Sequence, residues 1–489
     1  MRPSSQPSPC ADALPLVVDL DGTLLLTDML HESALQLVRD APWKALALPV
    51  WLAGGKAALK RRIAQQVDLP VAHLPYNQRL VAWLREQRAA GRRVVLCTAS
   101  DQGLADAVAA HLGCFDAVMA SDGATNLAGP AKAGALVRAF GERGFDYAGN
   151  SHADLPVWKA ARAAIVVNAQ GSVARRAEAQ GNVQRSFPPA PAGASAWRRA
   201  LRLHQWMKNL LLFVPLLAAH RVGDGAAWMQ LFVAFLAFGL CASSVYLAND
   251  LLDLESDRQH PRKRLRPFAA GTLPAWQGVA FVPVLAGASL WLAWATGPAF
   301  LGWLLVYFAT TWAYSLVLKR WALVDCVALA VLYTLRVVAG AAAVAQPLSF
   351  WLIASSGFLF LSLAFVKRYA ELLMQQAAGK TQAHGRGYLT SDAPIVQSLG
   401  VASGYTAVVV LALYLNSDTV FTMYRSPGLI WIAVPALAFW VSWMWLQAAR
   451  GQMHDDPLVF AFKDRASLVA GAVFVAALAA AATGPGWPW

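Results

Sequence analysis

Apolar runs dominate the C-terminal part of the chain, and each is about as long as a membrane-spanning helix, which needs ~20 residues. Charged residues are scarce inside these runs and collect between them. Because lipid cannot hydrogen-bond the backbone, a spanning segment must satisfy its own backbone groups, as an α-helix does. The pattern predicts an all-α membrane domain of about nine transmembrane helices. We place the spans at residues 206–222, 228–248, 275–296, 298–318, 321–344, 348–366, 397–416, 428–448 and 466–484.

The first 185 or so residues contain no run of this length. The best candidate, APWKALALPVWLAGG, holds a lysine and two prolines, so we interpret it as a buried or interfacial helix. A stretch rich in Pro and Ala, FPPAPAGASA, then separates the two halves. We therefore expect a flexible N-terminus at 1–13, a soluble domain at 14–186, a linker at 187–197 and a membrane domain at 198–489.

The charge balance fits a membrane protein. Net charge is +13, but only 14% of residues are charged, below the roughly 25% of soluble domains. The basic residues divide among the loops between spans, and twenty tryptophans are typical of bilayer interfaces. We therefore expect no nucleic-acid partner. Five cysteines without paired spacing predict reduced, mostly buried thiols and no zinc site; they are Cys10, Cys97, Cys114, Cys241 and Cys326.

Positive charge alternates between successive loops. The connections after the second, fourth, sixth and eighth predicted spans are basic, whereas the others, such as HRVGDGAA and AQPLS, carry little positive charge. By the positive-inside rule, the basic loops face the cytoplasm. The first residues, MRPSSQPSPCADALP, have no apolar core of signal-peptide length. We predict a multi-pass protein of the inner (cytoplasmic) membrane, with the soluble domain and the active sites on the cytoplasmic side.

Four segments of the N-terminal half combine apolar stretches with polar residues: LPLVVDLDGTLLLTD, GRRVVLCTASD, AGPAKAGAL and DYAGNSHADLPVW. Strands that alternate with helices predict a parallel sheet, whose ligand site lies at the carboxyl ends of its strands. Two carboxylates two residues apart suit one Mg²⁺, with one free to attack phosphorus. The polar residues that would meet there are Asp19, Asp21, Thr98, Lys132, Asn150 and Asp154.

In this order the segments resemble the haloacid dehalogenase (HAD) phosphatase superfamily, over roughly residues 14–185. The resemblance implies an α/β Rossmann-like fold in which residues 28–75 form a small helical cap. It implies that Asp19 is the nucleophile that becomes aspartyl-phosphate and that Asp21 is the general acid/base. Thr98 and Lys132 would hold the phosphoryl group.

Two further residues complete the metal site that the resemblance implies. Asp154 would support Mg²⁺ or Lys132. Asn150 stands where the family usually has an acidic residue, and its amide oxygen can still ligate Mg²⁺, though without charge. A degenerate, structural HAD domain is the alternative.

The stretch NDLLDLESDRQHPRKRLRP, residues 249–267, places many charges directly after an apolar run. Four of its polar residues recur every three or four positions, which puts them on one face of a helix; they are Asn249, Asp250, Asp253 and Asp257. Carboxylates so close repel one another unless a cation neutralises them. Mg²⁺ carrying a diphosphate would do so, with Lys263 and Arg266 on the phosphate oxygens. An ordinary juxtamembrane charge run explains the basic residues but not the acidic face.

The pattern N-D-x-x-D-x-x-x-D-x-x-H-P-x-K-x-x-R-P resembles the UbiA-type membrane prenyltransferases, over roughly residues 197–489. That resemblance implies nine helices around a cavity open to the bilayer, with Mg²⁺-diphosphate at its cytoplasmic mouth. Many members carry a second aspartate-rich stretch. Here YSLVLKRWALVDCVAL supplies only Asp325, together with Tyr314 and Lys319.

Other segments resemble one branch of this family, the decaprenyl-phosphate phosphoribosyltransferases: LRLHQWMKN, FVKRYAEL, GRGY and RGQMHDDPLVFAFKDRAS. In that branch the diphosphate belongs to phosphoribosyl pyrophosphate (PRPP). The phosphate oxygen of a polyprenyl phosphate attacks the anomeric carbon, and pyrophosphate leaves. Mg²⁺ held by Asp250, Asp253 and Asp257 would stabilise the leaving group.

Two anionic substrates need further cations to overcome their repulsion. Candidates at the predicted cytoplasmic span ends are Lys208, Lys263, Arg266, Lys319, Lys367 and Arg368. For Lys208 and Lys319, snorkelling to the interface is the alternative, and Tyr314 either orients a substrate or is a belt aromatic. We interpret HDDP, residues 454–457, as a structural loop and not as a metal site.

Together these features predict a bifunctional, Mg²⁺-dependent membrane enzyme. It would transfer 5-phosphoribosyl from PRPP to a polyprenyl phosphate, after which the HAD domain would remove the 5-phosphate, supplying a lipid-linked pentose for a cell-envelope glycan. One alternative is an aromatic prenyltransferase of quinone or haem synthesis. Another is a transporter or receptor with a regulatory soluble domain. The implied partners are PRPP, the lipid and the bilayer, and a homo-oligomer is left open.

Overall fold

The computed structural model describes residues 14–122, 125–189, 193–381, 386–417, 420, 423–453 and 456–484. The chain forms two compact units. The first comprises Met1–Leu201 and Tyr246–Val282, and the second comprises Arg202–Val245 and Pro283–Trp489. The acidic stretch 249–257 therefore belongs to the same unit as the N-terminal half.

The first unit contains a six-stranded parallel sheet in the order β3-β2-β1-β4-β5-β6. Its central strand β1 pairs in register with both neighbours, Leu16 lying opposite Val94 and Asp146. Apolar side chains on both faces bury the strand, as expected for a parallel sheet. The strands are β1 Leu16–Val18, β2 Val94–Asp101, β3 Ala117–Ser121, β4 Asp146–Gly149, β5 Ala164–Val167 and β6 Val183–Phe187.

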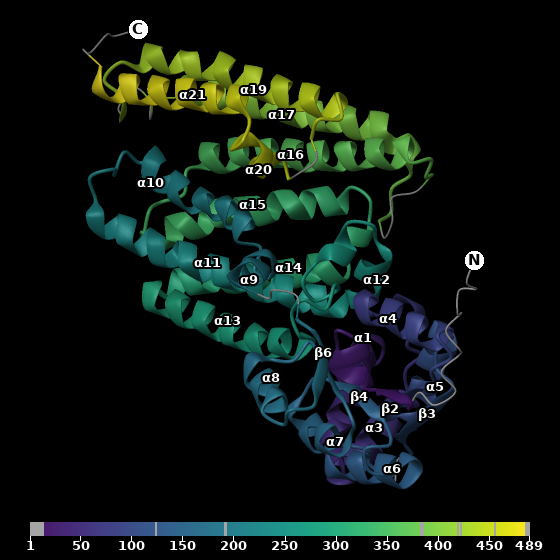
Figure 1. The fold of residues 1–489 in the computed structure, drawn as a ribbon. Coiled ribbons are helices and arrows are strands. Elements are labelled where there is room, and N and C mark those ends of the chain that lie inside the picture. The colour runs from purple at the N-terminus through teal and green to yellow at the C-terminus, as the bar shows by residue number, and fades with distance from the viewer. Residues whose placement is uncertain are drawn as a thin grey trace, which may run out of the picture. The chain divides into compact units, whose positions relative to one another are not determined.

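Helices cover both faces of this sheet, and Figure 1 shows α5, α6 and α7 around the strands. They are α4 Gln78–Ala89, α5 Gln102–Leu112, α6 Pro130–Phe140, α7 Leu155–Ala160 and α8 Gly171–Glu178. One apolar core joins Leu16 and Val18 to α4 and α5, and a second joins Val17 to Leu136 of α6 and Trp158 of α7. The α/β fold predicted from the sequence is confirmed.

A helical insertion separates β1 from β2. It consists of α1 Met29–Asp40, η2 Pro42–Ala47, α2 Leu48–Ala53, α3 Lys56–Ala64 and η3 Val71–His73. The carboxylate of Asp28 starts α1 by accepting a hydrogen bond from Leu30 N at 2.8 Å, which satisfies a donor that the helix itself leaves unpaired. We call this insertion the cap.

The acidic stretch lies in the first unit and runs from the end of α11 Gly225–Leu252 into α12 Leu254–Gln259, which contacts the cap. Arg258 makes two hydrogen bonds to the carboxylate of Glu32 on α1, at 2.7 and 3.0 Å. Arg39 Nη1 lies 2.6 Å from Glu255 Oε2. The pair between Arg258 and Glu32 is buried, so its two charges depend on one another for stabilisation.

Eight helices among the described residues are long and apolar enough to cross a membrane. Figure 1 shows α16, α17, α19 and α21 of the second unit side by side. The elements of these spans are α11 Gly225–Leu252, α13 Ala275–Thr296, α14 Pro298–Leu316, α15 Val324–Ala343, α16 Phe350–Ala377, α17 Ala393–Leu415, α19 Ala433–Ala449 and α21 Arg465–Thr483. Shorter elements are α9 Ala194–Ala200, η5 Leu203–Phe213, α10 Val214–Ala218, η6 Lys263–Leu265, η7 Leu318–Arg320, η8 Thr390–Asp392, η9 Pro427–Ile432 and α20 Pro457–Ala461.

Two predicted spans differ from the structure. The first, 206–222, is not one long helix but η5 followed by the short α10. Pro215 and the buried polar pair Lys208 and Asn209 interrupt what the apolar composition suggested. The sixth, 348–366, continues to Ala377, because ion pairs allow charged residues to remain inside the helix.

Candidate active sites

Asp19 follows β1 directly, at the carboxyl edge of the sheet. Its backbone N–H donates to Ala148 O at 2.9 Å, which joins the loop to β4. The chain then turns at Gly22, whose φ of 73° favours glycine. A Cβ at Gly22 would lie 1.9 Å from Asn150 Nδ2. The glycine therefore allows the loop after β1 and the loop after β4 to meet.

Lys132 of α6 lies beside Asp19 in the interior of the first unit. Its Nζ is 2.7 Å from Asp19 Oδ1 and donates a second hydrogen bond to Tyr147 Oη at 3.0 Å. Burial alone would lower the pKa of Lys132, but the carboxylates of Asp19 and Asp154 raise it above its ordinary value. Burial raises the pKa of Asp19 to about 7, although Lys132 opposes the shift.

Asp154 accepts four hydrogen bonds. Tyr147 donates to its Oδ1 at 2.8 Å, and Oδ2 accepts from Asn150 N, Ser151 N and Ser151 Oγ at 2.9–3.0 Å. A carboxylate has about four lone-pair sites, so these bonds leave Asp154 little capacity to ligate a metal. Of its two expected roles, the geometry favours support of Lys132, 3.8 Å away; ligation of Mg²⁺ by Asp154 stays a prediction.

Asp21 lies at the same edge of the sheet. Its Oδ2 accepts from Ser100 Oγ at 2.6 Å, and its Oδ1 accepts from Met29 N at 2.8 Å. Two lone pairs therefore remain for a cation. Burial raises the pKa of Asp21, with the Asp28 carboxylate adding to the effect. Thr98 is buried on β2, and its hydroxyl accepts from Ser100 N at 3.0 Å.

Tyr147 and Ser100 are residues that the sequence reasoning missed. Each had a signal. Ser100 stands two positions after Thr98 on a strand, where side chains share a face. Tyr147 is an aromatic in a short apolar strand, and a buried tyrosine hydroxyl needs a partner. The hydroxyl of Tyr147 connects Lys132 to Asp154.

The acidic stretch brings two of its three aspartates onto one arginine. Arg266 Nη1 lies 3.1 Å from Asp250 Oδ1 and 2.6 Å from Asp257 Oδ2. Asp253 lies between the end of α11 and the start of α12 and is half-buried. Burial raises the pKa of Asp257, against the opposing charge of Arg266. Asp250 and Asp257 therefore converge as the helical spacing predicts, while Asp253 takes no part in this contact.

The remaining predicted residues of this stretch lie close in sequence. Asn249 is on the last turns of α11, and Lys263 begins η6, three residues before Arg266. Each has a further interaction within the structure.

Two groups of side-chain oxygens have the donor chemistry that suits a hard cation such as Mg²⁺. One is in the acidic stretch, at Asp250 and Asp257, and the other is at the sheet edge, at Asp19 and Asp21. At Asp257, the Oδ1 atom is buried without a hydrogen-bond partner, which is the environment of an acceptor that awaits a cation. At the sheet edge, the amide oxygen of Asn150 is a third hard donor, in addition to the carboxylates of Asp19 and Asp21. Among the described residues, however, no three Asp, Glu, His or Cys side chains form a ready metal cluster.

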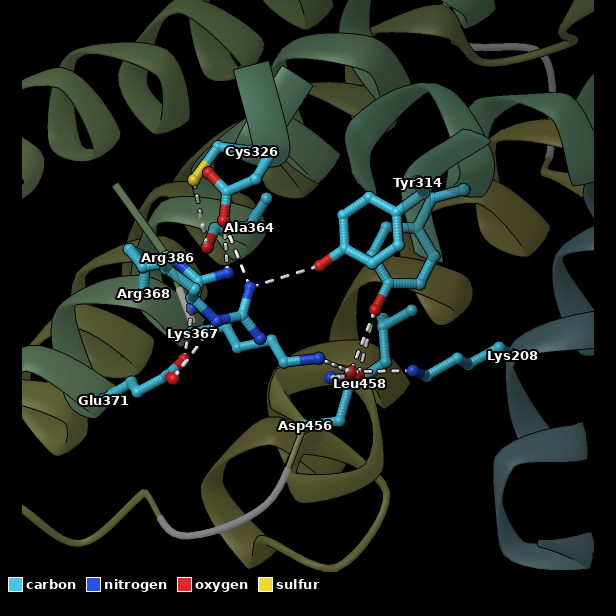
Figure 2. A network of polar contacts seen from close by, with 12 residues as sticks. Lys208, Tyr314, Cys326, Ala364, Lys367, Arg368, Glu371, Arg386, Asp456 and Leu458 are labelled. Carbon is cyan, nitrogen blue, oxygen red and sulfur yellow. Dashed lines mark hydrogen bonds and ion pairs between the residues drawn. The ribbon is translucent and has the colours of Figure 1, made fainter. Parts of the chain in front are cut away.

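The second unit contains a basic cluster around Asp456 (Figure 2). Lys208 Nζ donates to Asp456 Oδ2 at 2.7 Å, and Lys367 Nζ donates to the same atom at 3.2 Å. Tyr333 donates from its hydroxyl at 3.1 Å to each carboxylate oxygen. Burial alone would raise the pKa of Asp456, but the two lysines hold it below its ordinary range.

Arg336 adds a third cation to this cluster. Both Lys208 and Arg336 lie over the ring of Tyr333, 5.5 and 5.7 Å from its centroid. Arg336 also donates from Nε to Asn209 Oδ1 at 3.0 Å and from Nη2 to Tyr307 Oη at 2.9 Å, and both partners are neutral. Within the described residues, two lysines therefore pair with one carboxylate, Asp456, and Arg336 lies beside them over the ring of Tyr333. The loop 454–457 was interpreted as structural; His454 and Asp455 lie outside the described residues.

A second network in this unit is centred on Asp325. Arg368 is fully buried and forms ion pairs with Asp325 and Glu371. Arg386 lies 3.3 Å from both carboxylates. Tyr388 donates to Asp325 Oδ1 at 2.6 Å. Two arginines thus face two carboxylates, so this network is close to neutral and differs from the cluster around Asp456.

Three residues that were predicted to bind substrate differ in their surroundings: Arg368, Tyr314 and Lys319. Arg368 was expected at a span end open to substrate, but it lies inside α16 and its charge is compensated by Asp325 and Glu371. The hydroxyl of Tyr314 accepts from Arg386 at 3.3 Å. Lys319, half-buried on η7, makes no ion pair among the described residues.

An apolar groove of about 290 Å³ lies between α15 and α16 in the second unit. Thr334 is its one hydroxyl-bearing lining residue; the others are Val327, Ala330, Val331, Ile353, Ala354, Gly357, Phe358 and Leu361. Cys97, Cys114, Cys241 and Cys326 are free and buried, as predicted; Cys10 lies outside the described residues.

Comparison with known proteins identifies both parts of the chain. Residues 210–464 match the UbiA prenyltransferase family, and residues 16–159 match the haloacid dehalogenase-like hydrolases. A protein of Sinorhizobium fredii, described as uncharacterized protein y4nM, is 37% identical over 467 residues, which cover 95% of this chain and 90% of that protein.

Two further comparisons cover the membrane part. The decaprenyl-phosphate phosphoribosyltransferase of Mycolicibacterium smegmatis is 33% identical over 275 residues, which cover 55% of this chain and 86% of that enzyme. The solved structure of a UbiA homolog from Archaeoglobus fulgidus bound to GPP and Mg²⁺ is 16% identical, covers 58% of this chain and 99% of that chain, and has a TM-score of 0.44.

The family match spans more than half of the chain, and enzymes of both matched families generally use Mg²⁺. The chain therefore belongs to the UbiA prenyltransferase family, as a multi-pass membrane transferase joined to a haloacid dehalogenase-like hydrolase domain.

Proposed function

We propose that this protein transfers the 5-phosphoribosyl group of PRPP to a polyprenyl phosphate and that its HAD domain then removes the ribose 5-phosphate. The observation that carries the transferase half is the cluster around Asp456. Two lysines on one carboxylate, with Arg336 beside them over the ring of Tyr333, are costly inside a membrane protein unless a further anion joins them. A lipid phosphate is such an anion.

The cluster supports a monophosphate site. Lys208 and Lys367 present ammonium groups toward one point, and Tyr333 adds a hydroxyl donor. Charge-assisted hydrogen bonds of this kind are stronger than neutral ones. The apolar groove between α15 and α16 would suit part of an isoprenoid chain.

Asp250, Asp257 and Arg266 support the diphosphate site. Mg²⁺ bound by the two carboxylates would neutralise charge on the departing pyrophosphate. Arg266, which touches both aspartates in the structure, would bind pyrophosphate oxygens. A phosphate oxygen of the lipid forms the new bond to C1 of the ribose, while the bond between C1 and the pyrophosphate oxygen breaks with its electron pair. Asp253 and Lys263 would complete the site.

Asp19, Lys132 and Asp21 support the hydrolytic step. The carboxylate of Asp19 would attack the 5-phosphate, and the bond from phosphorus to the ribose oxygen would break. Asp21, which its raised pKa favours as a proton donor, would protonate that oxygen and later take a proton from the attacking water. Lys132 would hold the phosphoryl oxygens. Because the lipid product is confined to the bilayer, tethering both activities raises the effective concentration at the second site.

The transferase test uses full-length protein in lipid nanodiscs with Mg²⁺, PRPP labelled in the ribose and a polyprenyl phosphate. We expect a labelled lipid, identified by mass spectrometry, and its loss in Asp257→Asn. Geranyl diphosphate with an aromatic acceptor serves as the competing substrate pair. Prenylation of the acceptor without any labelled lipid would exclude phosphoribosyl transfer.

The phosphatase test compares the same reaction in wild type and Asp19→Asn. We expect polyprenyl-phosphate ribose from the wild type and the 5-phosphorylated lipid from the variant. If both proteins leave the 5-phosphate in place, the HAD domain does not act on this product, and the transferase proposal stands independently. Sidedness is tested by labelling cysteines introduced at exposed Glu142 and Arg264 in intact cells, where we expect protection from impermeant reagents.

A further inference from the structure

The cap contains an apolar segment, Pro42–Ala53, that is formed by η2 and α2. One side of it packs inward, where Leu48 and Trp51 contact the small core of Leu37, Leu59 and Ile63. The other side is also apolar but is left uncovered by the residues that the structure describes: Trp43 is 67% exposed, Leu46 82% and Val50 69%. A helical segment that is apolar all round normally needs a second apolar environment.

Three of the exposed apolar residues recur at helical spacing. Trp43, Leu46 and Val50 stand three and four positions apart, the spacing that places side chains on one side of a helical segment. Leu52 adds a further exposed apolar side chain at 50%. Tryptophan with aliphatic neighbours is the composition of segments that lie in the interface of a bilayer.

Charge points to the same partner. Between positions 41 and 67 the chain has no acidic residue, and its basic residues are Lys44, Lys56, Lys60, Arg61 and Arg62. Lys56, Arg61 and Arg62 are exposed. Basic side chains beside an apolar face favour a surface of anionic lipid.

The first unit also contains the end of a membrane span, since it includes α11 from Tyr246 to Leu252. α12 begins two residues after span α11 ends, and its Glu255 pairs with Arg39, near the end of α1 from which the apolar segment continues. Arg258 fastens α12 to Glu32 earlier on α1. The cap is thus attached to the end of a helix that crosses the bilayer.

We infer that Pro42–Ala53 is a membrane-docking element: Trp43, Leu46 and Val50 enter the headgroup region of an anionic bilayer, and the adjacent basic residues contact lipid phosphates. Its consequence for catalysis rests on the proposed phosphatase function. Docking of the cap on the bilayer would bring the active site close to a phosphate carried by a lipid. Hydrolysis of a soluble phosphomonoester would not depend on this docking.

The direct test places a fluorescent nitrobenzoxadiazole probe on Leu46→Cys in full-length protein, with Cys10 replaced by serine; the other four cysteines are buried. The protein is held in nanodiscs of phosphatidylcholine and phosphatidylglycerol. We expect blue-shifted emission and quenching by lipids that carry a spin label near the headgroup. The matched control is a probe on Glu142→Cys, an exposed position of the same unit, which we expect to remain in water.

Two outcomes of this experiment would overturn the inference. One is a probe at position 46 that is as hydrated and unquenched as the probe at 142. The other is self-quenching between labelled copies without quenching by lipid, which would assign the face to a second copy of the chain.

A functional test separates docking from folding. In Trp43→Glu/Leu46→Glu, we expect the KM for a lipid-borne phosphate in vesicles to rise about 10-fold, because the apolar contribution to binding is lost, with hydrolysis of p-nitrophenyl phosphate unchanged. Gln65→Glu/Gln66→Glu, which adds the same two negative charges at polar exposed positions, is the charge-matched control. An equal loss on both substrates would refute docking. If the wild type hydrolyses neither substrate, the phosphatase proposal fails, and the probe experiment still decides the inference.

Discussion

Two buried ion-pair centres in this protein have opposite stoichiometry. In the α/β unit one lysine, Lys132, faces two carboxylates, Asp19 at 2.7 Å and Asp154 at 3.8 Å. In the membrane unit one carboxylate, Asp456, faces two lysines, Lys208 at 2.7 Å and Lys367 at 3.2 Å. The same kinds of contact therefore leave an excess of negative charge in one unit and of positive charge in the other.

This difference indicates what each centre binds first. An excess of carboxylate repels a phosphate until a metal cation arrives, whereas an excess of ammonium attracts a phosphate directly. The metal dependence of substrate binding should therefore differ between the two units.

Removing Mg²⁺ with a chelator should have the largest effect and should act on the two centres differently. We expect hydrolysis at Asp19 to stop, since charge at the phosphate is then unopposed. Binding of polyprenyl phosphate at Lys208 and Lys367 should change less than about 2-fold, because the positive charge of these two ammonium groups does not depend on Mg²⁺. Filter binding of labelled lipid phosphate measures the second effect. A parallel loss of both would erase the contrast.

Asp456→Asn should destabilise the membrane unit by about 3 kcal/mol, since it leaves two lysines without their shared anion in a buried site. Thermal unfolding in nanodiscs measures this change. Combining it with Lys208→Met forms a double-mutant cycle, and the pair should cost clearly less than the sum of the single variants. Additive costs would mean that the contact at 2.7 Å contributes nothing.

Lys208→Met should raise the KM for polyprenyl phosphate about 30-fold, equivalent to about 2 kcal/mol for one charge-assisted hydrogen bond. The KM for PRPP should remain nearly constant. Lys319→Met, at a lysine that makes no ion pair within the described residues, is the matched control, with an expected change below about 3-fold. Equal effects of the two variants would show that general basicity, and not the cluster, binds the lipid.

Tyr147→Phe should have the smallest effect, about 1 kcal/mol or roughly 5-fold in the rate of hydrolysis, because it removes only the hydroxyl between Lys132 and Asp154. The loss should appear in kcat with little change in transfer activity. Since Lys132 keeps its direct contact with Asp19, a complete loss of hydrolysis would mean that Tyr147 does more than position the lysine.

Sequence patterns predicted that polar residues follow parallel strands to one edge of the sheet. Asp19 follows β1 and Asn150 follows β4, and their loops meet at Gly22, whereas Thr98 lies inside β2, which continues to Asp101. Helical spacing likewise predicted that Asp250 and Asp257 share a face, and both do contact Arg266. In each case short-range geometry was enough.

The cluster around Asp456 had no such signal. Its members Lys208, Tyr333, Lys367 and Asp456 lie far apart in the chain, and nothing local relates them. The end of α16 was misplaced for a similar reason: charged residues suggested a loop, but Asp325, more than forty positions earlier, compensates Arg368 inside the helix. A hydropathy pattern cannot account for an ion-pair partner that comes close only in the folded chain.

Apolar run length and side-chain periodicity depend on neighbouring positions, so they predicted a soluble part, a membrane part, the order of the sheet-edge residues and the acidic face that follows α11. Which charges are compensated depended on the folded structure. Packing of distant helices leaves Arg368 neutralised by Asp325 and Glu371, while Lys208 and Lys367 share Asp456. The physical reason is that electrostatic energy depends on distance in space and on burial, and both are set by folding.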